Sequence, residues 1–403
     1  MRIACVGGGP AGLYFAVVAK LRDPAREVVV VERNPQDTTC GWGVGYFDSL
    51  RHALHRVDPA SGREITARSV TWAGQQLRIG ERIVGLGGYG YGIERRQLLA
   101  VLQARAQQLG VQMRFGETVE DAADIDADLI VAADGHVSAL RSATADVFGT
   151  CVRTGANAYI WLSTSKEFTD FTFGCERTHA GWLWYHGYQF AAGASSVIVE
   201  CAARTWQALR LDALDNSAGL KLLSDVFARH LDGAPLLDRR PGRHPARWSR
   251  FATVTNERWN DGRVVLLGDA AHTAHYSIGS ATRLALEDAI ALEDALSAAG
   301  LDIAAALGRY AAERRPEVAR WQTEAAASAS WFESMDDHLV HNPIDVAHTL
   351  LRRRHPQAAA GLGVIDRSAW DYRLLRANQN PMLRRARWLV DTARQRRTAA
   401  RLR

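Results

Sequence analysis

A glycine cluster near the N-terminus constrains the fold of this chain more than any other feature. It stands between an apolar run at residues 3–6, typical of a strand, and an apolar segment at 13–21, typical of a helix. The glycines fit the pattern G-x-G-x-x-G, with Gly7, Gly9 and Gly12. In such a turn the first glycine permits the sharp bend, the second lets a pyrophosphate approach the backbone, and the third lets the helix pack on the strand. The pattern predicts a dinucleotide-binding unit.

A carboxylate at the end of the next expected strand supports this prediction. The apolar run at 28–31 ends in Glu32, at the spacing of about 20 residues where an acid accepts hydrogen bonds from an adenosine ribose. The following residue, Arg33, either adds positive charge beside that ribose or simply faces solvent.

Two further expected strands end in a glycine beside an acid. Asp134 and Gly135 follow a strand at 127–131, and Gly268 and Asp269 follow another apolar run. An anionic residue at a strand end and free amides at the start of the next helix suit a polar ligand that lies across them. Arg95 stands in the first turn of a further expected helix, where the helix dipole disfavours cations. It indicates an anionic partner or a solvent-facing side chain.

Composition excludes several classes of function. The formal net charge of +5 comes from the C-terminal 384–403, where eight arginines stand against one aspartate, so nucleic-acid binding is not expected. No apolar run is long enough to span a membrane. The five cysteines are scattered without a C-x-x-C pair, which argues against disulfides and structural zinc and favours a reducing compartment. We therefore expect a cytoplasmic protein without a metal site.

The middle of the chain has a different pattern of residue types. Residues 157–201 alternate in the manner of antiparallel strands and are rich in aromatic side chains. Such side chains are either core of the sheet or the roof of a pocket for a flat aromatic ligand. His186, embedded among them, is either a satisfied structural histidine or a catalytic one.

The pattern also makes three structural predictions. The glycine-rich segment 40–45 suits neither a helix nor a strand. A long alanine-rich helix at 301–332 is interrupted near Pro316. The helix that includes 284–296 turns its acidic residues away from its apolar stripe. These acids are Glu287, Asp288, Glu293 and Asp294.

The order and spacing of the glycine–acid motifs resemble the class A, para-hydroxybenzoate hydroxylase-like FAD-dependent aromatic monooxygenases. Residues 1–335 carry this resemblance. A closer likeness, to the salicylyl-CoA 5-hydroxylase and anthraniloyl-CoA monooxygenase branch, rests on 41–44, His186 with Tyr188, and above all GDAAHTAHYSIGSATRLALEDAI at 268–290. The sequence departs from that branch at Ala281, where a glycine is usual.

The resemblance implies a discontinuous site for FAD. Residues of the N-terminal motif would hold the ADP part, Arg95 would lie on the phosphate side, and Asp269 would bind the ribityl chain. The implied cofactor-binding residues are Gly7, Gly9, Pro10, Ala11, Gly12, Glu32, Arg33, Trp42, Gly43, Val44, Arg95, Val119, Asp134, Gly135, Gly268, Asp269, Gly279 and Ser280. The candidate proton acceptors for the substrate are His186, Tyr188 and His275.

The resemblance also implies the reaction. NADH or NADPH would reduce FAD, and O₂ would form a flavin C4a-hydroperoxide that hydroxylates an aromatic ring. The expected substrate is a salicyl- or anthranilyl-type thioester of CoA or a carrier protein, attacked at carbon 5. An indole or other fused-ring intermediate is the first alternative. A flavin-binding protein that does not oxygenate, or an oxidase, is the alternative of another class.

The expected fold is α/β. A Rossmann-type FAD-binding domain, formed by 1–156 and 240–335, would carry an inserted antiparallel β-sheet substrate domain at 157–239. A helical C-terminal extension with a basic tail would follow at 336–403. We expect a monomer or a homodimer.

Overall fold

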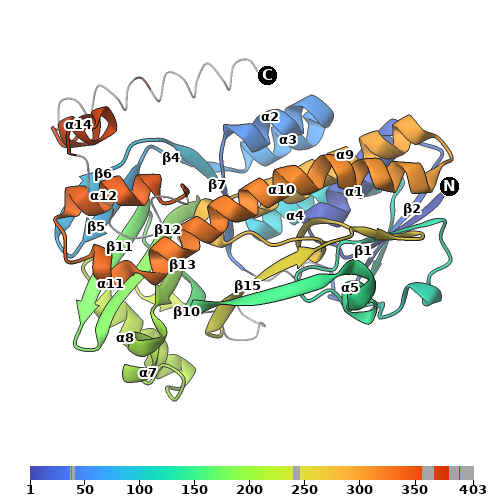
Figure 1. Cartoon of the computed structure of the whole chain (residues 1–403). Coiled ribbons are helices and arrows are strands. Elements are labelled where there is room, and N and C mark those ends of the chain that lie inside the picture. Colours follow the sequence, from blue (N-terminus) through green and yellow to red (C-terminus); the bar gives the residue numbers. More distant parts are fainter. Residues whose placement is uncertain (37, 39–40, 239–245, 356–366, 381–389, 391–403) are drawn as a thin grey trace.

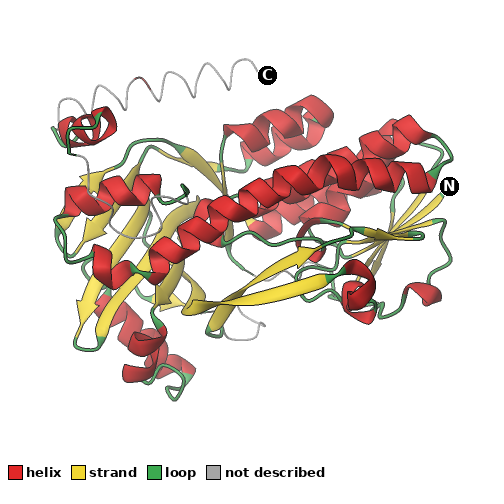
Figure 2. Cartoon of the chain, in the orientation of Figure 1, coloured by secondary structure: helices red, strands yellow, loops and turns green. Residues whose placement is uncertain are grey.

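The computed structural model describes residues 1–36, 38, 41–238, 246–355, 367–380 and 390 of the 403-residue chain. Two sheets lie toward opposite ends of the molecule, and the long helix α10 (Ile303–Glu333) runs along both of them (Figure 1). Figure 2 shows that helices cover the parallel sheet while strands dominate the other end. The α/β fold with C-terminal helices is the one predicted.

The first sheet is the predicted Rossmann-type unit. Its strand order is β16-β17-β9-β1-β2-β8, and all neighbours except β16 and β17 are parallel. The strands are β1 (Arg2–Val6), β2 (Glu27–Glu32), β8 (Gln112–Phe115), β9 (Leu129–Ala132), β16 (Asn260–Asp261) and β17 (Val264–Leu266). Helices α1 (Pro10–Arg22), α4 (Arg95–Gln108) and α9 (Ala281–Ala299) pack with them in one hydrophobic core. Buried apolar side chains on both faces are typical of a parallel sheet.

The second sheet has eight strands in the order β14-β10-β13-β12-β11-β5-β6, with β15 paired to β10. Its strands are β5 (Gln75–Ile79), β6 (Arg82–Gly85), β10 (Thr150–Thr164), β11 (Phe171–Thr178), β12 (Gly181–Ala191), β13 (Ala194–Cys201), β14 (Leu236–Leu237) and β15 (Ser249–Asn256). One face packs on α7 (Ala203–Ala208) and α8 (Asn216–Val226). The opposite face packs on α10 and carries Phe173 and Trp184, whereas Phe168 and Tyr185 lie on the face toward α7 and α8.

The segment at 40–45 was expected to lack regular structure, and that prediction was wrong. Gly43–Tyr46 forms β3, which pairs with β7 (Gly90–Glu94), beside β4 (Val70–Trp72). A Cβ on Gly43 would lie 2.5 Å from the Cβ of Phe190. The glycine is there because the second sheet packs directly on this strand, and no side chain fits between them.

The predicted interruption near Pro316 was also wrong, because α10 continues through it. A proline removes one hydrogen bond of the helix, but Arg314 and Val318 on either side of it are buried and pack against other elements. The remaining helices are α2 (Asp48–Val57), α3 (Pro59–Ala67), α5 (Ala139–Ala143), α6 (Ala145–Phe148), α11 (Met335–His338), α12 (Pro343–Arg352) and α14 (Trp370–Ala377). In the described residues no helix has the length and apolarity that crossing a membrane requires.

Strand β10 takes part in two ladders of the second sheet. It pairs with β15 from Thr150 to Thr154 and again at Ala158 and Tyr159, after an irregularity, and with β13 from Ala158 to Thr164. The second sheet also receives β5 and β6 from the N-terminal part of the chain. The proposed division at 156/157 and 239/240 stays a prediction, and it passes through this strand.

Candidate active site

The glycine turn after β1 has the geometry that a dinucleotide requires. Gly7 has a φ of +113°, and a Cβ there would lie 2.2 Å from the carbonyl oxygen of Ala133. A Cβ on Gly12 would lie 2.2 Å from the carbonyl oxygen of Gly7. Gly9 differs, because no heavy atom of the residues that the structure describes, apart from its chain neighbours, lies within 4 Å of the position of a Cβ. The first and third glycines are therefore needed for packing, whereas the second borders open space.

The ends of β2 and α1 complete this cradle. Glu32 accepts hydrogen bonds from the backbone N–H of Gly8 at 2.7 Å and of Asn34 at 2.9 Å, which fixes its carboxylate beside the turn. Gly9 caps α1 without a side chain, so the first amides of that helix stay available for an anion. Pro10 and Ala11 form the first turn of α1, and Arg33 is exposed.

Asp134 and Gly135 lie at the end of β9. One oxygen of Asp134 accepts from the backbone N–H of Ala139 at 2.8 Å, and the other, Oδ1, is buried without a hydrogen-bond partner in the described part of the chain. Arg141 donates to the carbonyl oxygen of Ala270 at 3.0 Å and to that of His136 at 2.7 Å. Arg141 thereby fastens the second glycine–acid motif to the third.

The third motif ends β17, where Gly268 has a φ of +60° and packs against Ala11 and Ala285. Asp269 is exposed although its neighbours Gly268 and Ala270 are buried. Because β1, β9 and β17 are adjacent and parallel, their carboxyl ends meet at one edge of the sheet. The structure thus brings the three motifs together, at the edge where α/β sheets bind their ligands.

The loop after Asp269 leads to a second helix start without a cap. Gly279 has a φ of +62°, and the hydroxyl of Ser280 is buried without a hydrogen-bond partner among the described residues. No side chain caps α9, so its first amides stay available for a ligand. Ala281, the departure from the related branch, is only half-buried at this point.

The remaining predicted cofactor residues flank the cradle. The backbone N–H of Arg95 donates to the carbonyl oxygen of Trp42 at 2.9 Å, which ties α4 to β3. Gly43 and Val44 are buried in β3, and Val119 is half-buried against the core of the first sheet. Glycines that allow close approach, two helix starts without caps, an accessible Asp269 and an unpartnered Asp134 oxygen together fit an elongated anionic dinucleotide such as FAD.

The candidate proton acceptors lie on the inner face of the second sheet and beside it. The hydroxyl of Tyr188 donates to the carbonyl oxygen of Gly43 at 2.9 Å, and burial raises its pKa to about 12. Nδ1 of His275 lies 2.8 Å from the hydroxyl of Ser277, and burial, followed by the charge of Arg353, lowers the pKa of His275 to about 3. Burial also holds the pKa of His186 well below its ordinary value. Both histidines are neutral at pH 7.

Glu200 is a further titratable group that the sequence prediction of site residues left out. Only 1% of it is exposed, yet it accepts from the hydroxyl of Tyr276 at 2.6 Å and from the amide of Asn157 at 2.7 Å. Burial raises its pKa to about 7, against the opposing effect of these donors. Nε2 of His186 lies 3.8 Å away. A carboxyl with a pKa near neutrality is suited to accept a proton.

A small cavity lies between β10, β13, β15, the loop at 275–276 and α10. Its lining combines polar and aromatic side chains, and it includes Asn157, Tyr159, Glu200, Phe251, His275 and Tyr276. Each strand places a side chain here because alternate residues point to the same face. The sequence signal that could have found Glu200 is a lone acid in an otherwise apolar strand, β13.

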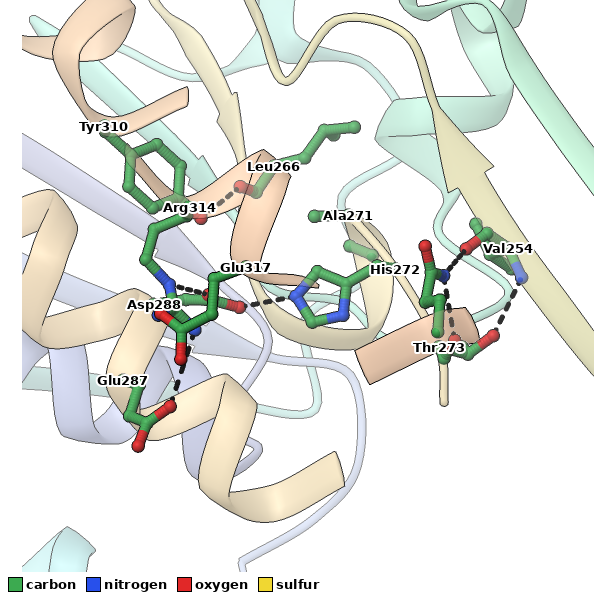
Figure 3. A network of polar contacts seen from close by, with 12 residues as sticks. Val254, Leu266, Ala271, His272, Thr273, Glu287, Asp288, Tyr310, Arg314 and Glu317 are labelled. Carbon is green, nitrogen blue, oxygen red and sulfur yellow. Dashed lines mark hydrogen bonds and ion pairs between the residues drawn. The ribbon is translucent and has the colours of Figure 1, made fainter. Parts of the chain in front are cut away.

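A buried ionic network holds the loop of the third motif. Figure 3 shows Asp288 of α9 between His272 and Arg314, at 2.7 Å and 2.8 Å. The hydroxyl of Tyr310 donates to the carbonyl oxygen of Leu266 at 3.2 Å. Burial raises the pKa of Asp288, but His272 and Arg314 outweigh this effect and hold the pKa below its ordinary value. Asp288, expected on the polar face of the helix, is fully buried.

Replacing Asp288 with alanine is expected to lower the free energy of unfolding by about 3–5 kcal/mol, because Nε of the buried Arg314 and Nε2 of His272 lose the carboxylate that they share. Denaturant titration with and without the change measures this loss. The matched control is Asp294→Ala on the same helix, an exposed acid paired with Arg22, for which a loss under about 1 kcal/mol is expected. Equal losses in both variants would contradict a structural role of the network. In the wild type, the contribution of Asp288 is present above its unfolded pKa and is lost as the pH falls.

Comparison with known proteins gives the family. Residues 88–325 match the model of the FAD binding domain family. The chain is 38% identical over 343 residues to salicyloyl-CoA 5-hydroxylase of a Streptomyces species, a match that covers 83% of this chain and 65% of the relative. It therefore spans about two thirds of that relative's length. It is 37% identical to the 3-hydroxy-4-methyl-anthranilyl-[aryl-carrier protein] 5-monooxygenase of Streptosporangium sibiricum, with 84% and 90% covered.

Solved structures confirm the fold. The tetrameric form of 2-methyl-3-hydroxypyridine-5-carboxylic acid oxygenase superposes with a TM-score of 0.70 at 20% identity, and the match covers 87% of this chain and 97% of the other. At this identity the likeness establishes the fold alone. Together with the matched family model and the two relatives, it leads to one conclusion: the chain belongs to the FAD-dependent aromatic monooxygenases.

Proposed function

We propose that this monooxygenase hydroxylates the ring of a salicyl- or anthranilyl-type group held as a thioester on CoA or a carrier protein, at carbon 5, with NADH or NADPH as reductant. The names of the two relatives support this substrate class. When bound, FAD accepts a hydride from the nicotinamide nucleotide and activates O₂ for transfer to the ring. We further propose a cytoplasmic location, which the scattered cysteines support, and a monomer or homodimer.

The chain's own residues would hold the cofactor in three places. The amides at the start of α1 would receive the pyrophosphate, Glu32 the adenosine ribose, and Asp269 the ribityl chain. Asp134 and the amides after Gly279 would border the flavin. The inner face of the second sheet, closed by Tyr188 against Gly43, would keep water from the reacting ring.

The observation that carries this proposal is Glu200 beside Tyr276 in an aromatic-lined chamber. Substrates of this class carry a ring hydroxyl or amine that can donate a hydrogen bond. Oε2 of Glu200, which accepts from the Tyr276 hydroxyl at 2.6 Å and is thereby held in place, would take the proton of a ring hydroxyl. An oxyanion on the ring raises electron density at the carbon para to it, which favours attack by an electrophilic oxygen.

The test is substrate-dependent consumption of NAD(P)H with identification of the product by mass spectrometry. The panel contains salicylyl-CoA, anthraniloyl-CoA, the two free acids and an indole. We expect products one oxygen atom heavier from a thioester. Products only from the free acids or the indole would remove the thioester assignment, and equal NADH oxidation with and without every compound would contradict hydroxylation altogether.

A further inference from the structure

Arg353 is a buried cation with no carboxylate paired to it in the residues that the structure describes. It follows α12, beyond the region that matches the FAD-binding family, and only 8% of it is exposed. Its guanidinium donates to the carbonyl oxygens of Ser277 at 2.8 Å and Leu350 at 2.7 Å, and to the hydroxyl of Ser328 at 3.1 Å. Burial, followed by the neighbouring charge of Arg354, lowers its pKa to about 9, so it stays charged at neutral pH.

Arg353 and Arg354 hold consecutive carbonyl groups of one loop. Arg354 donates to the carbonyl oxygen of Ile278 at 2.8 Å, next to the Ser277 carbonyl held by Arg353. Gly279 follows directly, and α9 begins two residues later. Two cationic side chains of the C-terminal extension thus bind the segment that would present amides to the flavin.

The charge of Arg353 has consequences that a neutral donor would not have. Burying an unpaired cation costs several kcal/mol. A neutral side chain could donate to the same carbonyl groups without this cost. The charge also reaches the inner chamber, because it contributes, after burial, to the lowered pKa values of His186 and His275. The position of the guanidinium agrees with this, because it stands over the rings of Phe173 at 5.2 Å and Phe332 at 5.9 Å, and both rings pack against His186.

We propose that Arg353 is a positioning residue for the flavin, which holds the loop at 277–280 and stabilises the negative charge that the flavin ring gains on reduction. The inference rests on the proposed FAD-dependent function. A hydride carries two electrons, so its transfer turns NAD(P)H into NAD(P)⁺ and the neutral oxidised ring into a monoanion. A nearby cation that water does not screen favours the anionic form over the neutral one.

The experiment compares Arg353→Gln, Arg353→Lys and wild-type holoenzyme. The readouts are the midpoint potential of bound FAD, measured by spectroelectrochemistry, and the thermal stability of the apoprotein. We expect Arg353→Gln to lower the potential by about 30 mV, which corresponds to a tenfold change in the equilibrium constant of a two-electron couple. Arg353→Lys should keep a midpoint potential close to that of the wild type, while the thermal stability of its apoprotein falls. Arg352→Gln, an exposed change on the same helix, is the control and should shift neither.

A purely structural role predicts another pattern. Arg353→Gln and Arg353→Lys would then lose stability alike and keep the wild-type potential, and this result would overturn the inference. If Arg353→Gln does not fold, Arg354→Gln tests the same idea at the neighbouring carbonyl: a smaller fall in potential supports it, and an unchanged potential refutes it. A wild-type protein that takes up no FAD would instead contradict the proposed function itself.

Discussion

Replacing Gly9 with alanine is expected to abolish FAD binding while the apoprotein keeps its wild-type stability. Gly9 has φ −76° and ψ 178°, which alanine adopts without strain, and no atom of the described residues other than its chain neighbours lies within 4 Å of the added methyl group. The methyl group would instead enter the space proposed for the pyrophosphate. We expect the dissociation constant of FAD to rise at least about a hundredfold, or roughly 2.7 kcal/mol. Fluorescence titration of the apoprotein with FAD measures it.

Two other glycines serve as controls for this prediction. Gly308→Ala, at an exposed position in the second turn of α10, also places its methyl group where no neighbouring atom of the described residues lies within 4 Å, and it should leave FAD binding unchanged. Gly7→Ala would force a methyl group to within 2.2 Å of a carbonyl oxygen, so it should damage folding as well as binding. Unchanged FAD affinity in Gly9→Ala would show that the pyrophosphate does not lie at this turn.

Replacing Glu200 with glutamine is expected to reduce kcat for a phenolic substrate by about 10²–10³, within the range of a general base. Glutamine preserves the shape of the side chain and its ability to accept from Tyr276, but it cannot take a proton. Binding of the aromatic thioester, measured through the flavin absorption spectrum, should change much less than kcat. Glu333→Gln, an exposed acid that lines the same cavity, is the matched control and should retain activity.

The pH profile separates Glu200 from the histidines. The proton acceptor must be deprotonated, so kcat/KM of the wild type should rise with pH through about 7, the raised pKa of Glu200. A base at His275 would place this limb near pH 3 instead. In Glu200→Gln, kcat/KM should no longer rise with pH near 7. If the limb persists in that variant, another group supplies the proton acceptor.

The cofactor cradle follows from sequence because its parts are local. Gly7 and Gly12 are required by contacts within one strand–turn–helix unit, and the parallel order of β1, β9 and β17 places the other two glycine–acid motifs beside it. The residue types alone therefore indicate which backbone conformation these positions adopt and where each strand ends. That these residues bind FAD as assigned stays a prediction until affinity is measured.

The parts that sequence did not reveal depend on contacts between distant segments. Asp288 looks like a surface acid of an amphipathic helix, because its partner Arg314 lies on another helix and His272 on a loop. Glu200 of β13 meets Tyr276 of the loop before α9. Arg353 reaches the loop at 277–278 from beyond the recognisable motifs. These contacts join residues that are far apart in the sequence, so no periodicity or spacing of residue types predicts them.

The continuous strand β10 limits how such enzymes can be recombined. Its first half pairs with β15 and its second half with β13, so an exchange of residues 157–239 alone between relatives would cut through this strand. The sheet also takes β5 and β6 from the N-terminal third of the chain. A functional chimera therefore has to transfer the segments at 75–85 and 150–256 as one unit. Crossovers at the apparent domain borders should yield insoluble protein.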